Sequence, residues 1–151
     1  MQRYLLFLAA SFSLCTSQKY LSHWTQYRLT EMFESTEASA LSEHFSEQAW
    51  EDYQASLPNL SSNDQDMSRH LESFINPVSI TKIDAQNYYA QSLFMVRFSN
   101  AHASWLQPIE MILTLNDVNG KVTIQHFEGI ASKPFSVKNH AIERATSCKN
   151  K

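Results

Sequence analysis

The stretch from Ile109 to Phe127, IEMILTLNDVNGKVTIQHF, decides the fold because two runs of alternating apolar residues flank Asn119-Gly120. Asn-Gly is the strongest short-range signal of a β-hairpin, since both residues accept the positive φ of a two-residue turn. Apolar residues at every second position are typical of a strand that buries one face. The stretch therefore predicts an antiparallel hairpin.

The turn also sets the register of the two strands. With two residues in the turn, the opposed pairs are Asp117–Val122, Leu115–Ile124, Leu113–His126 and Met111–Glu128. This register predicts that His126 faces inward as a hydrogen-bonded core histidine, and that Glu128 lies on the inward face near the edge of the sheet. Glu128 is then either a general base at the mouth of an apolar cavity or, as we favour, a carboxylate that reaches water past the end of the sheet.

The apolar pattern upstream of the hairpin changes from a helical to an alternating period. Strands are predicted at Val78–Ile83 and Ser92–Ala101, and helices at about Lys19–Ser35 and Glu37–Leu57. A third helix is predicted from apolar residues at 3–4–7–8 spacing, preceded by a capping box and ended by Asn76-Pro77. Its stripe is Met67, His70, Leu71, Phe74 and Ile75, and its capping box is Ser62 with Gln65.

Helices followed by strands predict an α+β fold, with N-terminal helices packed on a curved antiparallel β-sheet. The second predicted helix carries an apolar stripe at i+4 spacing, with Trp50 beside it; the stripe is Leu41, Phe45, Ala49 and Tyr53. We expect Trp50 to be a core residue against the inward face of the hairpin, which consists of Met111, Leu113, Leu115 and Ile124.

The first 17 residues have the pattern of a secretory signal peptide. Arg3 precedes the uncharged run Tyr4–Leu14, which is too short to span a bilayer. Cleavage is predicted after Ser17, with Ser13 as the alternative, and no lipid is expected on Cys15 because the bulky Leu14 precedes it. The mature chain is then one domain, residues 18–131, and a flexible basic tail, residues 132–151.

Composition and charge exclude several classes of function. The chain has two glycines, Gly120 and Gly129, so a glycine-rich phosphate loop is excluded. Residues 18–130 hold six Lys and Arg against fourteen Asp and Glu, and such an acidic body does not favour nucleic acid. The six histidines lack the spacing of a metal site, and no nucleophile elbow is present. We therefore expect no catalytic residue, cofactor or metal, and no enzymatic activity.

Three acidic residues, Glu43, Glu47 and Glu51, recur at i+4 spacing along the second predicted helix. A solvated helix face is the first interpretation of this pattern, because like charges at that spacing repel weakly. The alternative is an acidic surface that binds a partner protein. These glutamates are the candidate partner surface of the chain.

Four stretches together resemble the periplasmic domain of the IcmL/DotI-like family of type IVB (Dot/Icm) secretion systems. They are Tyr27–Phe33, His44–Trp50, Asn76–Val78 and the strand pair Met111–Leu115 with Val122–Phe127. The resemblance covers about Lys19–Ala131. The order of elements is also similar to the cone-shaped fold of nuclear transport factor two, in which helices pack against a bent antiparallel sheet.

The resemblance implies a non-catalytic protein-interaction domain that belongs to, or derives from, a type IVB secretion apparatus. Core members of the family keep an N-terminal transmembrane helix, whereas Met1–Ser17 here resembles a cleavable signal. We therefore expect a periplasmic or secreted paralogue without an integral span, whose partners are other secretion-system or cell-envelope proteins or further copies of itself. The alternative is a small-molecule-binding or isomerase-like protein that uses the pocket of the cone.

Overall fold

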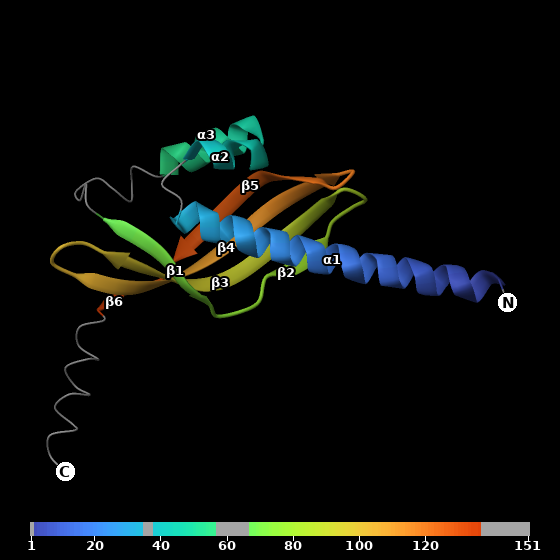
Figure 1. The fold of residues 1–151 in the computed structure, drawn as a ribbon, viewed down its shortest axis with the longest axis horizontal. Helices are drawn as coiled ribbons and strands as arrows, with labels where there is room; N and C mark the ends of the chain where they lie inside the picture. The colour runs from blue at the N-terminus through green and yellow to red at the C-terminus, as the bar shows by residue number, and fades with distance from the viewer. Residues whose placement is uncertain (1, 35–37, 57–66, 137–151) are drawn as a thin grey trace, which may run out of the picture.

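The computed structural model describes residues 2–34, 38–56 and 67–136, and it confirms the α+β class. The helical elements are α1 (Gln2–Glu34), α2 (Ala38–Leu41), the short 3₁₀ helix η1 (Ser42–His44) and α3 (Glu47–Ser56). The strands are β1 (Ser68–Phe74), β2 (Ser79–Lys82), β3 (Asn87–Ser99), β4 (Ser104–Val118), β5 (Lys121–Ala131) and β6 (Phe135–Ser136). Helix α1 lies across the sheet, and α2 and α3 lie beside it near β5 (Figure 1).

All strand pairs in the sheet are antiparallel. The central order is β1-β3-β4-β5, with β2 added to β3 on the side of β1 and β6 added to β4 on the side of β5. The long pair β3–β4 runs in unbroken register from Asn87–Asn116 to Ser99–Ser104. These two strands therefore form the middle of the sheet and carry residues from both faces along their whole length.

The core lies between α1 and one face of the sheet. Leu21, Leu29 and Met32 recur on one side of α1 and are at most 2% exposed. Phe94 of β3 and Leu113 of β4 oppose them from the sheet and are fully buried. Burial of each such side chain contributes about 1.5–3 kcal/mol, which explains why this helix packs on this face.

The predicted signal peptide falls inside α1, which is helical without interruption from Gln2 to Glu34. The N-terminal half of this helix extends beyond the sheet (Figure 1), and the first fully buried side chain described along it is Leu21. Among the described residues, no helix is both long enough and apolar enough to cross a membrane. Cleavage after Ser17 stays a prediction.

At the C-terminal end, β6 occupies part of the predicted tail, and residues 137–151 lie outside the described residues.

The third predicted helix is wrong, because Ser68–Phe74 form strand β1. Leu71 pairs with Val96 and Phe74 with Phe94, while Glu72 is skipped by the pairing with β3. This β-bulge adds one residue, so two side chains three residues apart reach the same buried face. The spacing that predicted a helix therefore arises from a bulged strand. His70, which was predicted to lie on the apolar stripe, is exposed. The predicted capping box at Ser62 and Gln65 lies outside the described residues.

The second predicted helix is interrupted at Phe45, whose extended backbone forms a parallel bridge with Ile124 of β5. The Ser46 amide donates a hydrogen bond to the Ile124 carbonyl oxygen at 2.8 Å, and the Ser46 hydroxyl accepts one from the Ala49 amide at 3.3 Å. Ser46 thus acts as the N-cap of α3. The predicted apolar stripe stays buried in spite of the break, namely Leu41, Phe45, Ala49 and Tyr53.

The predicted hairpin is confirmed at its turn and wrong beyond it. Asn119 and Gly120 have φ of 54° and 83°, and the pairs Asp117–Val122 and Leu115–Ile124 form as predicted. A bulge at Gln125 then shifts the register by one residue. The subsequent pairs are Thr114–His126, Leu113–Phe127, Ile112–Glu128 and Met111–Gly129. A shift of one residue moves each side chain to the other face, so His126 and Glu128 are exposed on the outer face.

Candidate functional site

The three glutamates of the candidate partner surface lie on two elements. Glu47 and Glu51 are exposed one turn apart on α3, whereas Glu43 belongs to η1 and is separated from them by the break at Phe45. The predicted spacing therefore survives only for Glu47 and Glu51. Both are held at the β5 side of the molecule by the hydrogen bond between Ser46 and Ile124. All three glutamates remain accessible to a partner.

Beneath α3 lies a cluster of four aromatic rings, Phe45, Trp50, Tyr53 and Phe127. Phe45 lies 5.5 Å from Trp50, 5.3 Å from Tyr53 and 6.5 Å from Phe127, measured between ring centroids. The Tyr53 hydroxyl donates a 2.9 Å hydrogen bond to the Met32 carbonyl oxygen, which ties α3 to the end of α1. Burial raises the pKa of Tyr53, so this phenol stays protonated and keeps donating. Trp50 packs against the core and is half-buried.

An open cleft of about 260 Å³ lies between α1, η1 and the turn of the β4–β5 hairpin. Its lining residues are Trp24, Glu43, His44, Gly120, Lys121 and Val122. The His44 ring meets the Trp24 ring edge-on at a centroid distance of 6.0 Å. The cleft therefore presents one aromatic wall and ionisable groups of both signs to solvent.

Several charged groups surround His44. Its Nε2 lies 3.4 Å from Oε1 of Glu43, and the Arg28 guanidinium lies 5.5 Å from the centre of the Trp24 ring, in cation–π geometry. Arg28 also forms an ion pair with Glu31 one turn along α1. Burial lowers the pKa of His44, and the positive charge of Arg28 lowers it further, while Glu43 and Glu31 partly offset both effects. The neutral imidazole is thus the favoured form in the folded protein.

The histidines are spread over the described part of the molecule, and no three His, Cys, Asp or Glu residues there are grouped as metal ligands. Nδ1 of His70 lies 2.8 Å from Oε1 of Glu34, so it links β1 to the end of α1. His126 and Glu128 lie on the outer face of the sheet, away from the helices. The hypothesis of an inward general base at Glu128 is therefore wrong.

The sequence did not predict the arrangement around His44. Trp24 and Arg28 are one helical turn apart, and this spacing alone could have indicated a cation–π pair. The approach of His44 and of the hairpin turn is non-local, and it depends on the break at Phe45. No local pattern in the sequence indicates that break.

Comparison with known proteins defines the fold. No family model matches the chain, and no curated protein matches it either. The crystal structure of an IcmL-like type IV secretion system protein from Legionella pneumophila subsp. pneumophila str. Philadelphia 1 superposes with a TM-score of 0.61 at 13% sequence identity. The match covers 78% of this chain and 95% of that chain. The two proteins share a fold.

This match confirms the predicted resemblance to an IcmL-like fold. The interior of the chain can be compared with the alternative prediction, a protein that uses a pocket inside the cone. Among the described residues no Asp, Glu, His, Lys or Arg is buried, and the buried side chains with polar groups are Thr25, Ser92, Tyr53 and Tyr88. Aromatic and aliphatic side chains such as Phe33, Phe94 and Leu113 occupy the space between α1 and the sheet. Such filling favours a structural interior over a ligand pocket.

Proposed function

We propose that the chain is a non-catalytic, exported protein-interaction domain of the bacterial cell envelope, and a component or paralogue of a type IVB secretion apparatus. The observation that carries the proposal is the match to the IcmL-like protein, which spans 95% of that chain. Fold alone does not determine function, so the site must agree with the proposal. The filled interior agrees with the proposal, because a fold without an internal ligand pocket binds other molecules through its outer surface.

The surface proposed to bind the partner is the acidic side of α3 and η1. Glu47 and Glu51 are exposed on a helix whose opposite side is buried at Ala49 and Tyr53. A rigid element that displays charges steers a basic partner and fixes its orientation more than it adds raw affinity. The proposed partner is therefore a secretion-system or envelope protein with a basic docking surface.

The test is purification of the tagged chain from the envelope of its native bacterium after mild cross-linking. We expect type IVB secretion proteins among the products, and we expect changing Glu43, Glu47 and Glu51 together to Gln to reduce their yield. The matched control changes Glu110 and Glu128 to Gln on the other face of the sheet, which leaves that yield unchanged. Recovery of the chain from the cytoplasm alone would contradict the proposal.

A further inference from the structure

The cleft between α1, η1 and the β4–β5 turn is open to solvent and small. Its volume of about 260 Å³ is below the roughly 300–1,000 Å³ that is typical of pockets for free small molecules. A protein cavity of about 150 Å³ holds benzene, so the cleft has room for one ring. Trp24, His44 and Val122 supply its aromatic and aliphatic lining, against which a further ring packs favourably edge-on or offset. The cleft therefore fits one aromatic side chain of another protein.

The wall that α1 contributes to the cleft is held in place by a stack of side chains. The Arg28 guanidinium lies 5.5 Å from the centre of the Trp24 ring and 4.8 Å from the centre of the Tyr27 ring. Arg28 is also paired with Glu31, so its charge is already engaged. Tyr20 recurs on the same side of the helix as Tyr27, and these two rings are 51% and 59% exposed. Trp, Tyr and Arg are the residue types that dominate binding energy at protein interfaces, so this side of α1 extends the contact surface beyond the cleft.

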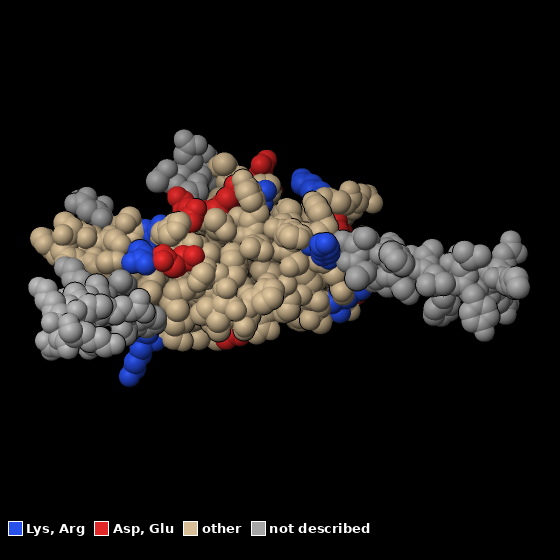
Figure 2. All heavy atoms as spheres, turned by 60° about the horizontal axis from the view of Figure 1, so that its bottom comes forward, with Lys and Arg blue, Asp and Glu red and all other residues tan. Residues whose placement is uncertain are grey.

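The two ends of the cleft differ in the sign of their charge. Strand β5 begins at Lys121 beside the cleft, meets Phe45 at Ile124 and contacts the ring cluster beneath α3 at Phe127. Lys121 has no ion-pair partner among the described residues. At the other end, residues 38–56 of α2, η1 and α3 carry four acidic side chains and no Lys or Arg. This charge is local, because Figure 2 shows a broad uncharged surface at the centre of another face.

We propose that the cleft binds an extended segment of a partner protein that carries one aromatic residue with basic residues on one flank of it. The inference rests on the proposed function and names the chemistry of the partner. The aromatic side chain enters the cleft beside Trp24, and the basic side chains reach Glu47 and Glu51 on α3. Residues four apart on a helix are separated by about 6 Å, and alternate residues of an extended segment by about 6.6 Å, so basic residues at every second position match the two glutamates. Lys121 repels basic residues on the other flank, which fixes the direction of the segment.

The experiment measures binding of labelled peptides to the purified chain by fluorescence anisotropy. The first probe is a peptide of glycine and serine that carries one phenylalanine near its N-terminus, followed by three arginines at alternate positions. The second probe has the same residues in reverse order. We expect one of the two to bind with a millimolar or lower Kd, and about threefold more tightly than the other, because Lys121 opposes one direction. Replacing the phenylalanine of the tighter peptide by alanine should weaken its binding about fivefold or more.

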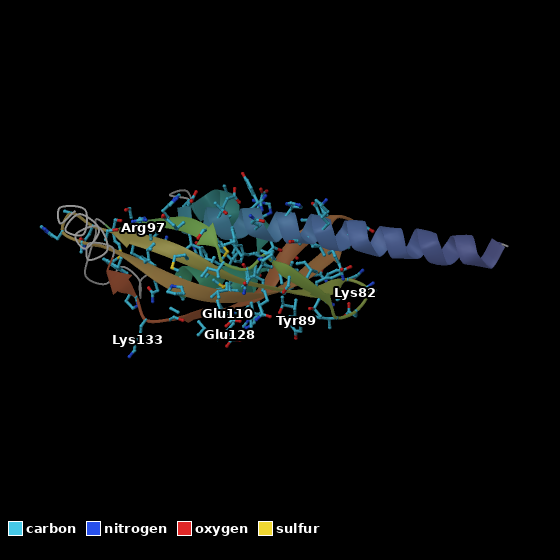
Figure 3. All side chains as sticks on the ribbon, turned by 90° about the horizontal axis from the view of Figure 1, so that it is seen from below. Lys82, Tyr89, Arg97, Glu110, Glu128 and Lys133 are labelled. Carbon is cyan, nitrogen blue, oxygen red and sulfur yellow. The ribbon has the colours of Figure 1, made fainter. Side chains whose placement is uncertain are left out.

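A matched pair of double variants tests where the arginines bind. Glu47→Gln with Glu51→Gln should raise the Kd about threefold or more, because two exposed charge pairs are lost. Glu110→Gln with Glu128→Gln removes the same charge from the outer face of the sheet, which Figure 3 shows on the side away from α1. This control should leave the Kd unchanged. All four side chains are exposed or partly exposed, so the changes should have little effect on folding.

A second matched pair tests the role of Lys121. Lys121→Glu should tighten binding about twofold or more and remove the preference for one peptide order, because the repulsion is gone. Lys133→Glu makes the same change in net charge at another exposed site, and it should do neither.

Absence of binding by both peptides at millimolar concentration would overturn the inference. An alanine peptide that binds as tightly as the phenylalanine peptide would also overturn it, and so would control variants that change the Kd as much as the variants beside the cleft. The assay uses purified protein alone, so its failure is distinguishable from failure of the proposed function. Peptide binding by a chain that is recovered from the cytoplasm alone would retain the inference about the cleft and contradict the role in secretion.

Discussion

At the scale of single residues, His44 is the group whose protonation the fold opposes. Its ring lies edge-on against Trp24, with the Arg28 guanidinium on the same aromatic side chain and Glu43 beside it. Lys121 of β5 lines the same cleft. Neutral His44 therefore helps to hold η1 against α1, whereas protonated His44 adds a positive charge beside Arg28.

This arrangement predicts a loss of stability on acidification. The pKa of His44 is lower in the folded chain than its ordinary value of 6.5, so the unfolded chain takes up the proton first as pH falls. The stabilising contribution is fully present above pH 6.5 and is lost as pH falls through the folded pKa. Urea titrations at pH 7.5 and 5 should show a smaller loss for His44→Gln than for the wild type. The exposed His126→Gln is the matched control, and it should follow the wild type.

Trp50 gives a second prediction at this scale. It is half-buried and lies 5.6 Å from Tyr53, measured between ring centroids, so Trp50→Ala removes part of the cluster beneath α3. We expect a loss of about 2–3 kcal/mol, below the ~3–5 kcal/mol typical of fully buried aromatic residues. Tyr20→Ala is the comparison, because it removes a half-exposed ring from α1. We expect it to lower the free energy of unfolding by less than about 1 kcal/mol, as is usual for substitutions at the surface. Equal unfolding midpoints for Trp50→Ala and wild type would show that this ring does not support the core.

At the scale of elements, the break at Phe45 leaves two of the three glutamates of the candidate partner surface on one helix. Glu47 and Glu51 still repel one another at i+4, but Glu47 also lies in the first turn of α3, where negative charge is favourable. Both effects are a few tenths of a kcal/mol. Changing Glu43, Glu47 and Glu51 together to Gln should therefore alter the free energy of unfolding by less than about 0.5 kcal/mol. A larger loss in thermal melts would show that these side chains support the fold.

The sequence predicts the elements of this fold better than their register. Asn119-Gly120 defines a local turn, and apolar residues at helical spacing define the helix at about Lys19–Ser35, so both were predictable. The bulges at Glu72 and Gln125 depend on the partner strand, and a single-strand pattern does not reveal them. One bulge made β1 look helical, and the other moved His126 and Glu128 to the outer face. Glu47 and Glu51 were correctly predicted as exposed on one helix because charge at helical spacing is a local signal, whereas the break at Phe45 places the exposed Glu43 on η1.

At the scale of the whole molecule, the proposal that the chain is exported predicts where its mature N-terminus lies. The mature N-terminus should be Gln18 or lie within a few residues of it, because small residues end at Ser17 and Leu14 disfavours lipid on Cys15. Cleavage there keeps the buried residues Leu21, Leu29 and Met32 of α1 within the mature chain. Intact-mass spectrometry of exported protein should give this unmodified species. An acylated Cys15 as the first residue would contradict it.

Site-specific photo-cross-linking in the native bacterium tests whether the acidic side of α3 and η1 binds a secretion-system or envelope protein. A photoreactive residue replaces Glu51 on α3 in one strain and Tyr89, on the outer face of the sheet, in another. The account predicts that the probe at position 51 forms an adduct with a second type IVB secretion or envelope protein. It predicts that the probe at position 89 does not capture that protein. Adducts at position 51 with cytoplasmic proteins alone, or the same heterologous adduct from both positions, would contradict the account.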